Sequence, residues 1–305
     1  MSKLACVFPG QGSQSVGMLK ELADNFSSVT QTFEQASDAL GYDLWKLTQD
    51  DDGTKLNQTH ITQPALLTAS IAAFRVLQHE KELAPKYLAG HSLGEYTALV
   101  ASEVLSLEDA VSLVEARGKY MQDAVPSGTG AMYAIIGLDD EKIITICAQV
   151  AKETSQVVSP VNFNSPGQIV IAGNKEAVEL AGEACKEAGA KRALPLAVSV
   201  PSHCALMKPA ADALEARLAQ ISFHEPKYAV VNNVDVNVES TADAIKQALV
   251  KQLYSPVRWT ETVQYLVKQG VEEIVEIGPG KVLTGLNKRI DKSLVLSSFS
   301  APSDL

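Results

Sequence analysis

The chain has 305 residues, of which 46% are hydrophobic and 20% charged, and its formal net charge is −10. This composition is typical of a soluble globular protein with room for one large domain or two. The acidic balance argues against a nucleic-acid-binding protein, which usually carries a surplus of basic residues.

The first twelve residues contain one lysine and a short apolar run, so they lack the long apolar segment of a signal peptide. No apolar run approaches the roughly 18–20 residues that span a bilayer. We therefore expect a cytoplasmic protein that makes no membrane contact. The four cysteines have no CxxC spacing and are expected to be reduced and buried, and neither a metal site nor a resident cofactor is expected.

The N-terminal third alternates between strands and helices. Residues 3–8 predict a buried strand, a glycine-rich loop follows, and a helix is expected near 18–25. The loop does not match G-x-G-x-x-G, because Ser15 replaces the third glycine, and this argues against a nucleotide site. A helix over 61–84 precedes a strand at 87–90, a turn at Ser92 and a helix to about residue 103, and Ser106 is the expected N-cap of the next helix.

Residues 126–199 have a different pattern. Strand 131–138, helix 139–153, a hairpin of strands 156–163 and 168–173, helix 174–189 and strand 190–198 form a β-α-β-β-α-β series, typical of a ferredoxin-like unit. We expect this small domain to be inserted in a large α/β domain made of residues 1–125 and 200–305.

The remaining chain completes the expected large domain. It predicts a helix over 204–221, a strand at 228–234, helices over 241–253 and 259–269, a strand at 272–278 and a last helix from Val282. Alternating strands and helices indicate a mainly parallel sheet with helices on both faces, in an α/β-hydrolase-like core.

The segment Gly-His-Ser-Leu-Gly, residues 90–94, lies between a predicted strand and a predicted helix. This G-x-S-x-G pattern is typical of a nucleophile elbow, in which a strained turn exposes the serine and needs tiny neighbours. The helix that follows would direct backbone N–H groups at an oxyanion. The alternative is a capped turn without reactivity.

A reactive serine needs a base, and two of the five histidines are the main candidates. His91 adjoins Ser92, but successive side chains at a turn point apart, so we expect it to support the elbow. His203 lies where a loop leads into a helix and could point into a cleft. The residues alone leave its role open.

Arg117 lies at the edge of an apolar helix stripe, between Leu113 and Met121. A guanidinium keeps its proton, so a buried one needs a partner. It could form an internal salt bridge or extend to solvent, or it could bind the carboxylate of a substrate as a fork. Both interpretations stay open at this point.

Taken together, the motifs resemble those of malonyl-CoA:acyl carrier protein transacylases. The matching segments are FPGQGSQ (8–14), GHSLGEY (90–96), RGxxM (117–121), GAM (130–132), NFNSPGQIVIAG (162–173), VPSHCALM (200–207), QLYSPVRW (252–259) and EIGPGKVL (276–283). They follow the family's order over nearly the whole chain, which is similar to the discrete enzyme of bacterial fatty acid synthesis.

The resemblance implies a set of roles. Ser92 would accept the acyl group, and His203 would be its base, oriented by the backbone carbonyl of Gln252 instead of an acidic residue. The backbone amides of Gln11 and Leu93 would form the oxyanion hole. Arg117 would hold the malonyl carboxylate. Met121 and Asn162 would complete the substrate site, with the small domain closing over it.

The implied partners are malonyl-CoA and the acidic acyl carrier protein. Two basic pairs, Lys191–Arg192 and Lys288–Arg289, could provide a local docking surface on this acidic chain, or could be ordinary solvated residues. We expect a monomer. Two other functions remain to be tested: a serine esterase or thioesterase, and a non-catalytic module that binds carrier protein.

Overall fold

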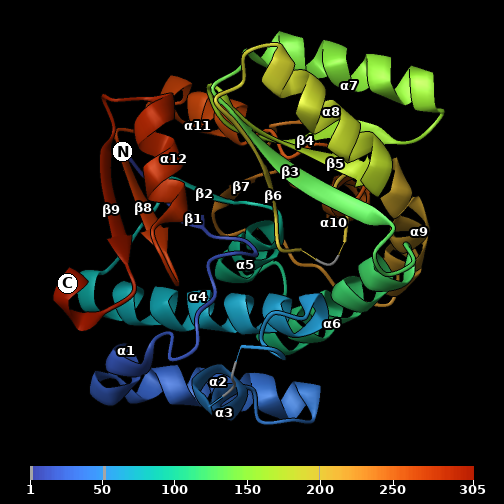
Figure 1. Cartoon of the computed structure of the whole chain (residues 1–305). Helices are drawn as coiled ribbons and strands as arrows, with labels where there is room; N and C mark the ends of the chain where they lie inside the picture. Colours follow the sequence, from blue (N-terminus) through green and yellow to red (C-terminus); the bar gives the residue numbers. More distant parts are fainter. Residues whose placement is uncertain (1–2, 51–52, 199) are drawn as a thin grey trace.

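The chain folds around two β-sheets, as a computed structural model that describes residues 3–50, 53–198 and 200–305 shows (Figure 1). The larger sheet has five parallel strands in the order β7-β2-β1-β8-β9. Their bounds are Ala229–Val231, Tyr87–Gly90, Leu4–Phe8, Glu273–Ile277 and Val295–Phe299.

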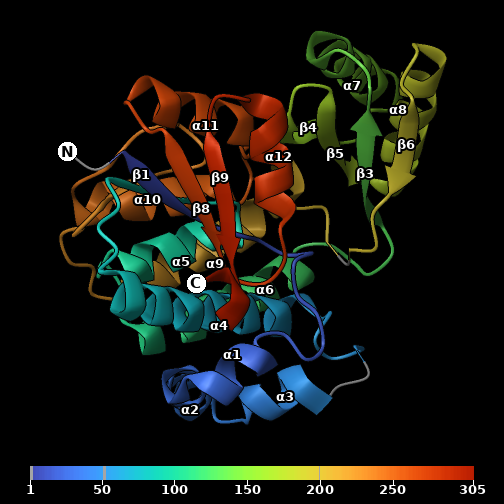
Figure 2. The same ribbon diagram turned by 90° about the vertical axis from the view of Figure 1, so that its left-hand side faces the viewer.

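Helices cover both faces of this sheet, and residues of β1 show why. Cys6 and Phe8 belong to one apolar cluster, together with residues of the helices α2, α4, α5, α6, α9 and α10. Ala5 and Val7 point the other way, into a cluster with residues of α11 and α12. Because successive side chains alternate across a strand, a strand buried on both sides has to be apolar throughout. In Figure 2, α11 and α12 lie above and to the right of the strands, and α4, α5 and α6 lie below them.

The strand order is that of a doubly wound sheet, which reverses direction between its first and fourth strands, here β1 and β8. In such sheets ligands bind beyond the carboxyl ends of the strands, near that reversal. The loop at Gln11 follows β1 and the turn at Ser92 follows β2, so both lie at this edge.

The smaller sheet has four antiparallel strands in the order β4-β5-β3-β6: Val158–Ser165, Gln168–Asn174, Gly130–Ile136 and Arg192–Pro195. The helices α7 (Asp140–Thr154) and α8 (Lys175–Glu187) pack on its outer face (Figure 1). The element order is β-α-β-β-α-β, so the predicted fold class, with its ferredoxin-like unit, is confirmed. The boundaries at 125/126 and 199/200 stay a prediction, and Ser199 lies outside the described residues.

The remaining helices are α1 (Lys20–Asn25), α2 (Ser27–Leu40), α3 (Leu44–Asp50), α4 (Thr59–Lys81), α5 (Leu93–Ala101), α6 (Leu107–Asp123), α9 (Lys208–Leu218), α10 (Ala242–Gln252), α11 (Trp259–Lys268) and α12 (Val282–Ile290). Short 3₁₀ turns span Ala205–Met207 and Pro302–Asp304. The sequence did not predict α2, α3 or β9. Within the described ranges, none of the helices has the length and apolar character required to cross a membrane.

Backbone hydrogen bonds join the small sheet to the segment between α10 and α11. The amide of Phe163, in β4, donates to the carbonyl of Val257 over 2.9 Å, and the amide of Val257 donates to Val161 over 2.8 Å. This bridge pairs Asn162 with Val257, just before α11. It therefore fixes Asn162 beside the carboxyl edge of the large sheet.

Candidate active site

Ser92 occupies a strained turn between β2 and α5. Its φ of 52° and ψ of −106° lie outside the ordinary regions for a non-glycine residue. A Cβ on Gly90 would lie 1.9 Å from the backbone of Gly94, and a Cβ on Gly94 would lie 2.1 Å from the carbonyl oxygen of Phe8. The turn can therefore press against β1 only because both flanking residues lack a side chain.

Asn233 holds this turn from the side. The amide of Ser92 donates to Asn233 Oδ1 over 2.7 Å, and Asn233 Nδ2 donates to the carbonyl of Gly90 over 2.7 Å. Although Ser92 is the N-cap of α5, its hydroxyl makes no capping hydrogen bond. Its Oγ is therefore available to other groups.

His203 lies beside that hydroxyl. Its Nε2 is 2.8 Å from Ser92 Oγ, and its Nδ1 is 2.7 Å from the backbone carbonyl oxygen of Gln252. A carbonyl only accepts, so Nδ1 carries the proton and Nε2 is left as the acceptor for the serine hydroxyl. Burial, and then the nearby Arg117 cation, lower the pKa of His203 to about 3, which keeps the ring neutral.

Arg117, on α6, is the charged group closest to this pair. Its side chain is buried, with 1% of its surface exposed, so it does not extend to solvent. Its guanidinium donates to Gln63 Oε1 over 2.7 Å, to Gln252 Oε1 over 3.0 Å and to Ser92 Oγ over 3.3 Å. The guanidinium carbon also lies 5.2 Å from the centre of the Tyr96 ring.

No carboxylate among the described residues forms an ion pair with Arg117. Its Nε is buried and has no hydrogen-bond partner in the same part of the chain. Burial lowers the pKa of this arginine, and its ordinary value is high enough that it stays charged. A buried cation without a carboxylate partner is suited to an anionic ligand.

These groups meet in one cavity of about 100 Å³ between the two sheets. Its lining includes the predicted residues Gln11, Ser92, Leu93, Arg117, Met121, Asn162 and His203. Among the described residues, neither the Gln11 amide nor the Leu93 amide donates to a protein acceptor. Leu93 is the first residue of α5, where a backbone N–H has no acceptor within the helix. Gln252 lies behind the cavity and reaches it through its hydrogen bonds.

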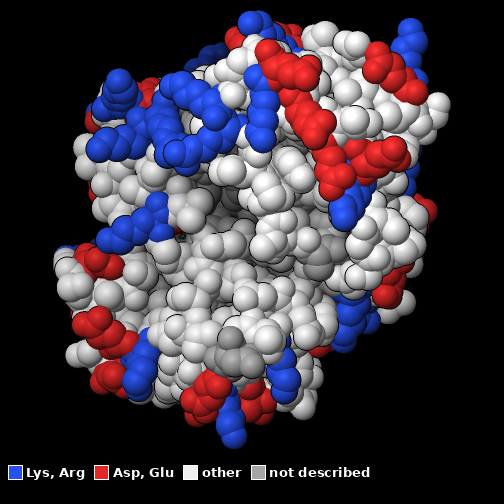
Figure 3. Space-filling model, in the orientation of Figure 1, with Lys and Arg blue, Asp and Glu red and all other residues white. Residues whose placement is uncertain are grey.

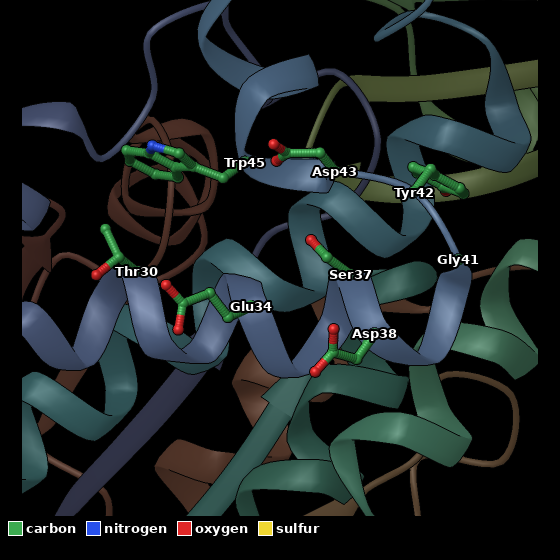
Figure 4. A pocket seen from close by; sticks show the side chains of 8 residues that line it. All are labelled: Thr30, Glu34, Ser37, Asp38, Gly41, Tyr42, Asp43 and Trp45. Carbon is green, nitrogen blue, oxygen red and sulfur yellow. The ribbon is translucent and has the colours of Figure 1, made fainter.

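A larger hollow, of about 590 Å³, lies far from Ser92 in the chain, between α2 and α3 (Figure 4). It is lined by Thr30, Glu34, Ser37, Asp38, Gly41, Tyr42, Asp43 and Trp45. The hydroxyl of Ser37 donates to the Phe33 carbonyl and accepts from the Leu44 amide, so it has a structural partner on each side. This hollow brings no histidine to its serine, and we do not assign the chemistry to it.

The predicted basic pairs lie outside the cavity. Arg289, on α12, donates to Gln168 of β5. Gln168 pairs across the sheet with Ile136, which pairs in turn with Arg192, so Arg192 lies two strand spacings, about 10 Å, from Gln168. Figure 3 shows Lys and Arg gathered over the region of α11 and α12, beside the central hollow of this face, whereas Asp and Glu follow α8.

Sequence reasoning missed four polar residues that surround the site: Gln63, Glu95, Asn164 and Asn233. Nε2 of His91 donates a 2.8 Å hydrogen bond to Asn164 Oδ1, so His91 links the turn to β4. Gln63 offered a signal as an uncharged polar residue among the buried positions of helix α4. Asn233 had no signal, because nothing local ties it to Ser92.

The remaining predictions concern cysteines and metals. All four cysteines are free and buried, as expected. Cys204, next to His203, donates its thiol to the carbonyl of Pro201, and burial raises the pKa of that thiol to about 11, which argues against reactivity. Within the described residues, no group of three or more His, Cys, Asp or Glu side chains could hold a metal ion.

Comparison with known proteins agrees with this geometry. Residues 5–295 match the model of the acyl transferase domain family. The malonyl CoA-acyl carrier protein transacylase of Escherichia coli K12 is 63% identical over 303 residues, which cover 99% of this chain and 97% of the relative.

Two solved structures superpose closely on the chain. One is an acyl carrier protein S-malonyltransferase from Vibrio cholerae O1, with a TM-score of 0.97, 61% identity and coverage of 99% of this chain and 98% of the other. The second is a malonyl-transacylase in complex with a type II PKS acyl-carrier protein, with a TM-score of 0.97, 61% identity and coverage of 99% and 97%. The chain therefore belongs to the acyl transferase family and, within it, to the malonyl CoA-acyl carrier protein transacylases.

Proposed function

We propose that the chain transfers the malonyl group from malonyl-CoA to the phosphopantetheine thiol of acyl carrier protein, by way of an ester on Ser92. The observation that carries this proposal is the position of Ser92 Oγ, which lies 2.8 Å from His203 Nε2 and 3.3 Å from the Arg117 guanidinium. One hydroxyl thus contacts both a neutral base and a cation that suits a carboxylate.

In the first half-reaction, His203 Nε2 takes the proton of the Ser92 hydroxyl as Oγ bonds to the thioester carbon. The carbonyl oxygen becomes an oxyanion, which the amides of Gln11 and Leu93 stabilise. When the intermediate collapses, the carbon–sulfur bond breaks and the CoA sulfur takes the proton from His203. The malonyl group is left as an ester on Ser92.

The second half-reaction reverses these steps with a new thiol. His203 takes the proton of the phosphopantetheine thiol as its sulfur attacks the ester carbon, and the same two amides stabilise the oxyanion. The bond to Ser92 Oγ then breaks, and Oγ recovers the proton from His203. Both reactants are substrates, so the scheme uses no resident cofactor.

The orienting group of His203 favours transfer over hydrolysis. The acceptor at its Nδ1 is the neutral carbonyl of Gln252, whereas a hydrolase triad places a carboxylate there. A carbonyl stabilises the imidazolium less, so the base is weaker. A thiol gives up its proton more readily than water, and we therefore expect the ester to persist until a thiol arrives.

Arg117 would select the acyl group. A malonyl ester on Ser92 carries its free carboxylate three bonds away from Oγ, within the reach of a guanidinium that already contacts that oxygen. Met121 and Asn162 line the same cavity and would contact the malonyl chain. An acetyl group has no carboxylate for this cation, so the site should prefer malonyl-CoA.

The carrier protein would approach across α12. A groove of about 180 Å³ shares Gln11, His91, Asn162 and Leu196 with the cavity and continues along Val282, Leu283 and Leu286 of α12, which gives room for the phosphopantetheine arm. Lys288 and Arg289 follow on the same helix, and Lys191 and Arg192 lie at the start of β6 in the small sheet. These cations would attract the acidic carrier protein to the groove.

One experiment separates this function from its alternatives. The protein is incubated with isotope-labelled malonyl-CoA, and its intact mass and the peptide containing Ser92 are measured with and without carrier protein. We expect a stable malonyl ester that disappears only when carrier protein is added, and no ester in the Ser92→Ala variant. Steady release of free malonate would indicate an esterase or thioesterase, and absence of any ester would indicate a non-catalytic binding module. A cytoplasmic location stays a prediction.

A further inference from the structure

Glu95 is a buried carboxylate one helical turn after Ser92, and only 2% of its surface is exposed. The sequence Ser-Leu-Gly-Glu has the spacing of a capping box, in which the glutamate would reach back to the amide of Ser92. That arrangement is not formed. Asn233 accepts from the Ser92 amide, and the Glu95 side chain turns into the interior. A carboxylate buried without a capping role needs another explanation.

The contacts of Glu95 lead to Gln252. Glu95 Oε2 accepts from Gln252 Nε2 over 2.9 Å and from the backbone amide of Asn233 over 2.9 Å. Gln252 Nε2 also donates to the carbonyl of Ser92 over 3.1 Å. On the other side of the same amide group, Gln252 Oε1 accepts from the Arg117 guanidinium over 3.0 Å.

These contacts fix the orientation of the Gln252 side-chain amide. A side-chain amide can rotate so that its oxygen and nitrogen exchange places, and its surroundings decide which orientation is held. Glu95 Oε2 accepts from the backbone amide of Asn233 as well as from Gln252, so Glu95 requires the Nε2 side of Gln252. The oxygen of Gln252 is then left facing Arg117, where it can only accept.

Burial and the neighbouring groups act on Glu95 in opposite directions. Burial raises the pKa of Glu95 to about 7, and the hydrogen bonds from Asn233 and Gln252 and the charge of Arg117 act against that rise. Arg117 has no carboxylate within ion-pair distance among the described residues, so Glu95 acts on it across the Gln252 amide. The guanidinium is thereby held while its remaining donors stay available.

We propose that Glu95 is a positioning residue for acyl-group selection, which orients the Gln252 amide and through it holds Arg117 for the substrate carboxylate. The inference rests on the proposed function, in which Arg117 binds the malonyl carboxylate. It predicts a selective effect, because Glu95 acts on the group that recognises malonate. A purely structural role, through Asn233 and the turn, would affect every acyl group equally.

The test compares the rates at which Ser92 is acylated by malonyl-CoA and by acetyl-CoA, measured by intact mass without carrier protein. Glu95→Ala removes the acceptor. Glu95→Asp keeps the charge but is one methylene too short to reach both donors. Glu95→Gln keeps an oxygen that can accept from both and is expected to rescue the selectivity. Glu276→Gln is the matched control, because Glu276 is a buried carboxylate that accepts from the amides of Leu283 and Thr284, in α12.

We expect the malonyl-to-acetyl rate ratio to fall about tenfold or more in Glu95→Ala and Glu95→Asp, and to stay within about threefold of wild type in Glu95→Gln and Glu276→Gln. An equal fall for both esters, or an unchanged ratio in Glu95→Asp, would overturn the inference. If Glu95→Ala does not fold, the malonyl-to-acetyl rate ratios of Glu95→Asp and Glu95→Gln still test the inference. A wild-type protein that forms no malonyl ester, or does not prefer malonyl-CoA, would instead contradict the proposed function.

Discussion

Replacing Arg117 by alanine removes the guanidinium that lines the Ser92 cavity, and so tests the proposed grip on the malonyl carboxylate. The substrate carboxylate would then be buried against Met121 and the methyl group of the new alanine without a cation. Acetyl-CoA offers no carboxylate and should lose little. We therefore expect the Arg117→Ala variant to shift its preference from malonyl-CoA towards acetyl-CoA.

The size of the effect follows from the burial of Arg117, of which 1% is exposed. Removing one partner of a buried, hydrogen-bonded ion pair costs about 3–5 kcal/mol. At about 1.4 kcal/mol for each tenfold change, kcat/KM for malonyl-CoA should fall by a factor of about 10² to 4 × 10³. Arg117→Lys keeps a charge but loses the two-pronged geometry, and should fall between the alanine variant and wild type.

The assay measures the acylation of Ser92 by each CoA ester under single-turnover conditions, with thermal unfolding of every variant alongside. Acetyl-CoA acylation reports whether Ser92 and His203 remain intact. Arg75→Ala provides a control arginine, because its exposed guanidinium bonds Thr32 and Gln35 away from the cavity. That variant should leave the ratio of the two rates unchanged.

Two results would refute the reasoning. If Arg117→Ala kept the wild-type preference for malonyl-CoA, the arginine would not bind the carboxylate. If both esters lost reactivity by the same factor, Arg117 would serve Ser92 or the fold instead, through its contacts with Gln63 and Gln252.

Three further predictions address the base, the turn and the docking surface. The folded-state pKa of His203, lowered to about 3, lies below its unfolded value of about 6.5, so wild type should lose stability relative to His203→Gln as the pH falls from 6.5 to 5. The slope should rise from about 0.7 kcal/mol per pH unit at pH 6.5 to about 1.4 kcal/mol per pH unit near pH 5. The free energy of unfolding of both proteins is measured by urea titration at each pH. A difference between them that does not change with pH would show that folding does not lower the pKa of His203. Gly94→Ala places its Cβ 2.1 Å from the carbonyl oxygen of Phe8 in β1, and should lower the melting temperature and abolish acylation of Ser92. The control is Gly285→Ala, whose Cβ would lie in open space, and which should leave the melting temperature unchanged or raise it. Steady-state kinetics of Lys288→Glu with Arg289→Glu should show a raised KM for carrier protein and unchanged acylation by malonyl-CoA; an unchanged KM would reject this docking surface.

Local patterns were sufficient for most of the secondary structure and for the turn at Ser92. Wherever a strand or helix has one apolar face, hydrophobic residues recur in the sequence with a period of two or 3.6. The alternation of strands and helices then predicts a parallel sheet. Gly90 is a local requirement, since its Cβ would meet Gly94 of the same turn, whereas Gly94 is required by the neighbouring strand β1. The strand β9 escaped prediction because its buried and exposed residues alternate weakly and Val295 is 62% exposed.

The partners of Ser92 were decided only by the tertiary structure. His203 and Gln252 lie 111 and 160 residues further along the chain, and they reach Ser92 because the chain returns from the small sheet to the edge of the large sheet. From the sequence, Arg117 could equally have paired with an internal carboxylate, and Glu95 had the spacing of an ordinary capping box. Packing of the two sheets buried both side chains beside Gln252. The sequence alone therefore determined which residue could be the nucleophile. Long-range packing decided which histidine, which arginine and which buried carboxylate surround it, because contacts between residues far apart in the chain produce no local pattern in the sequence.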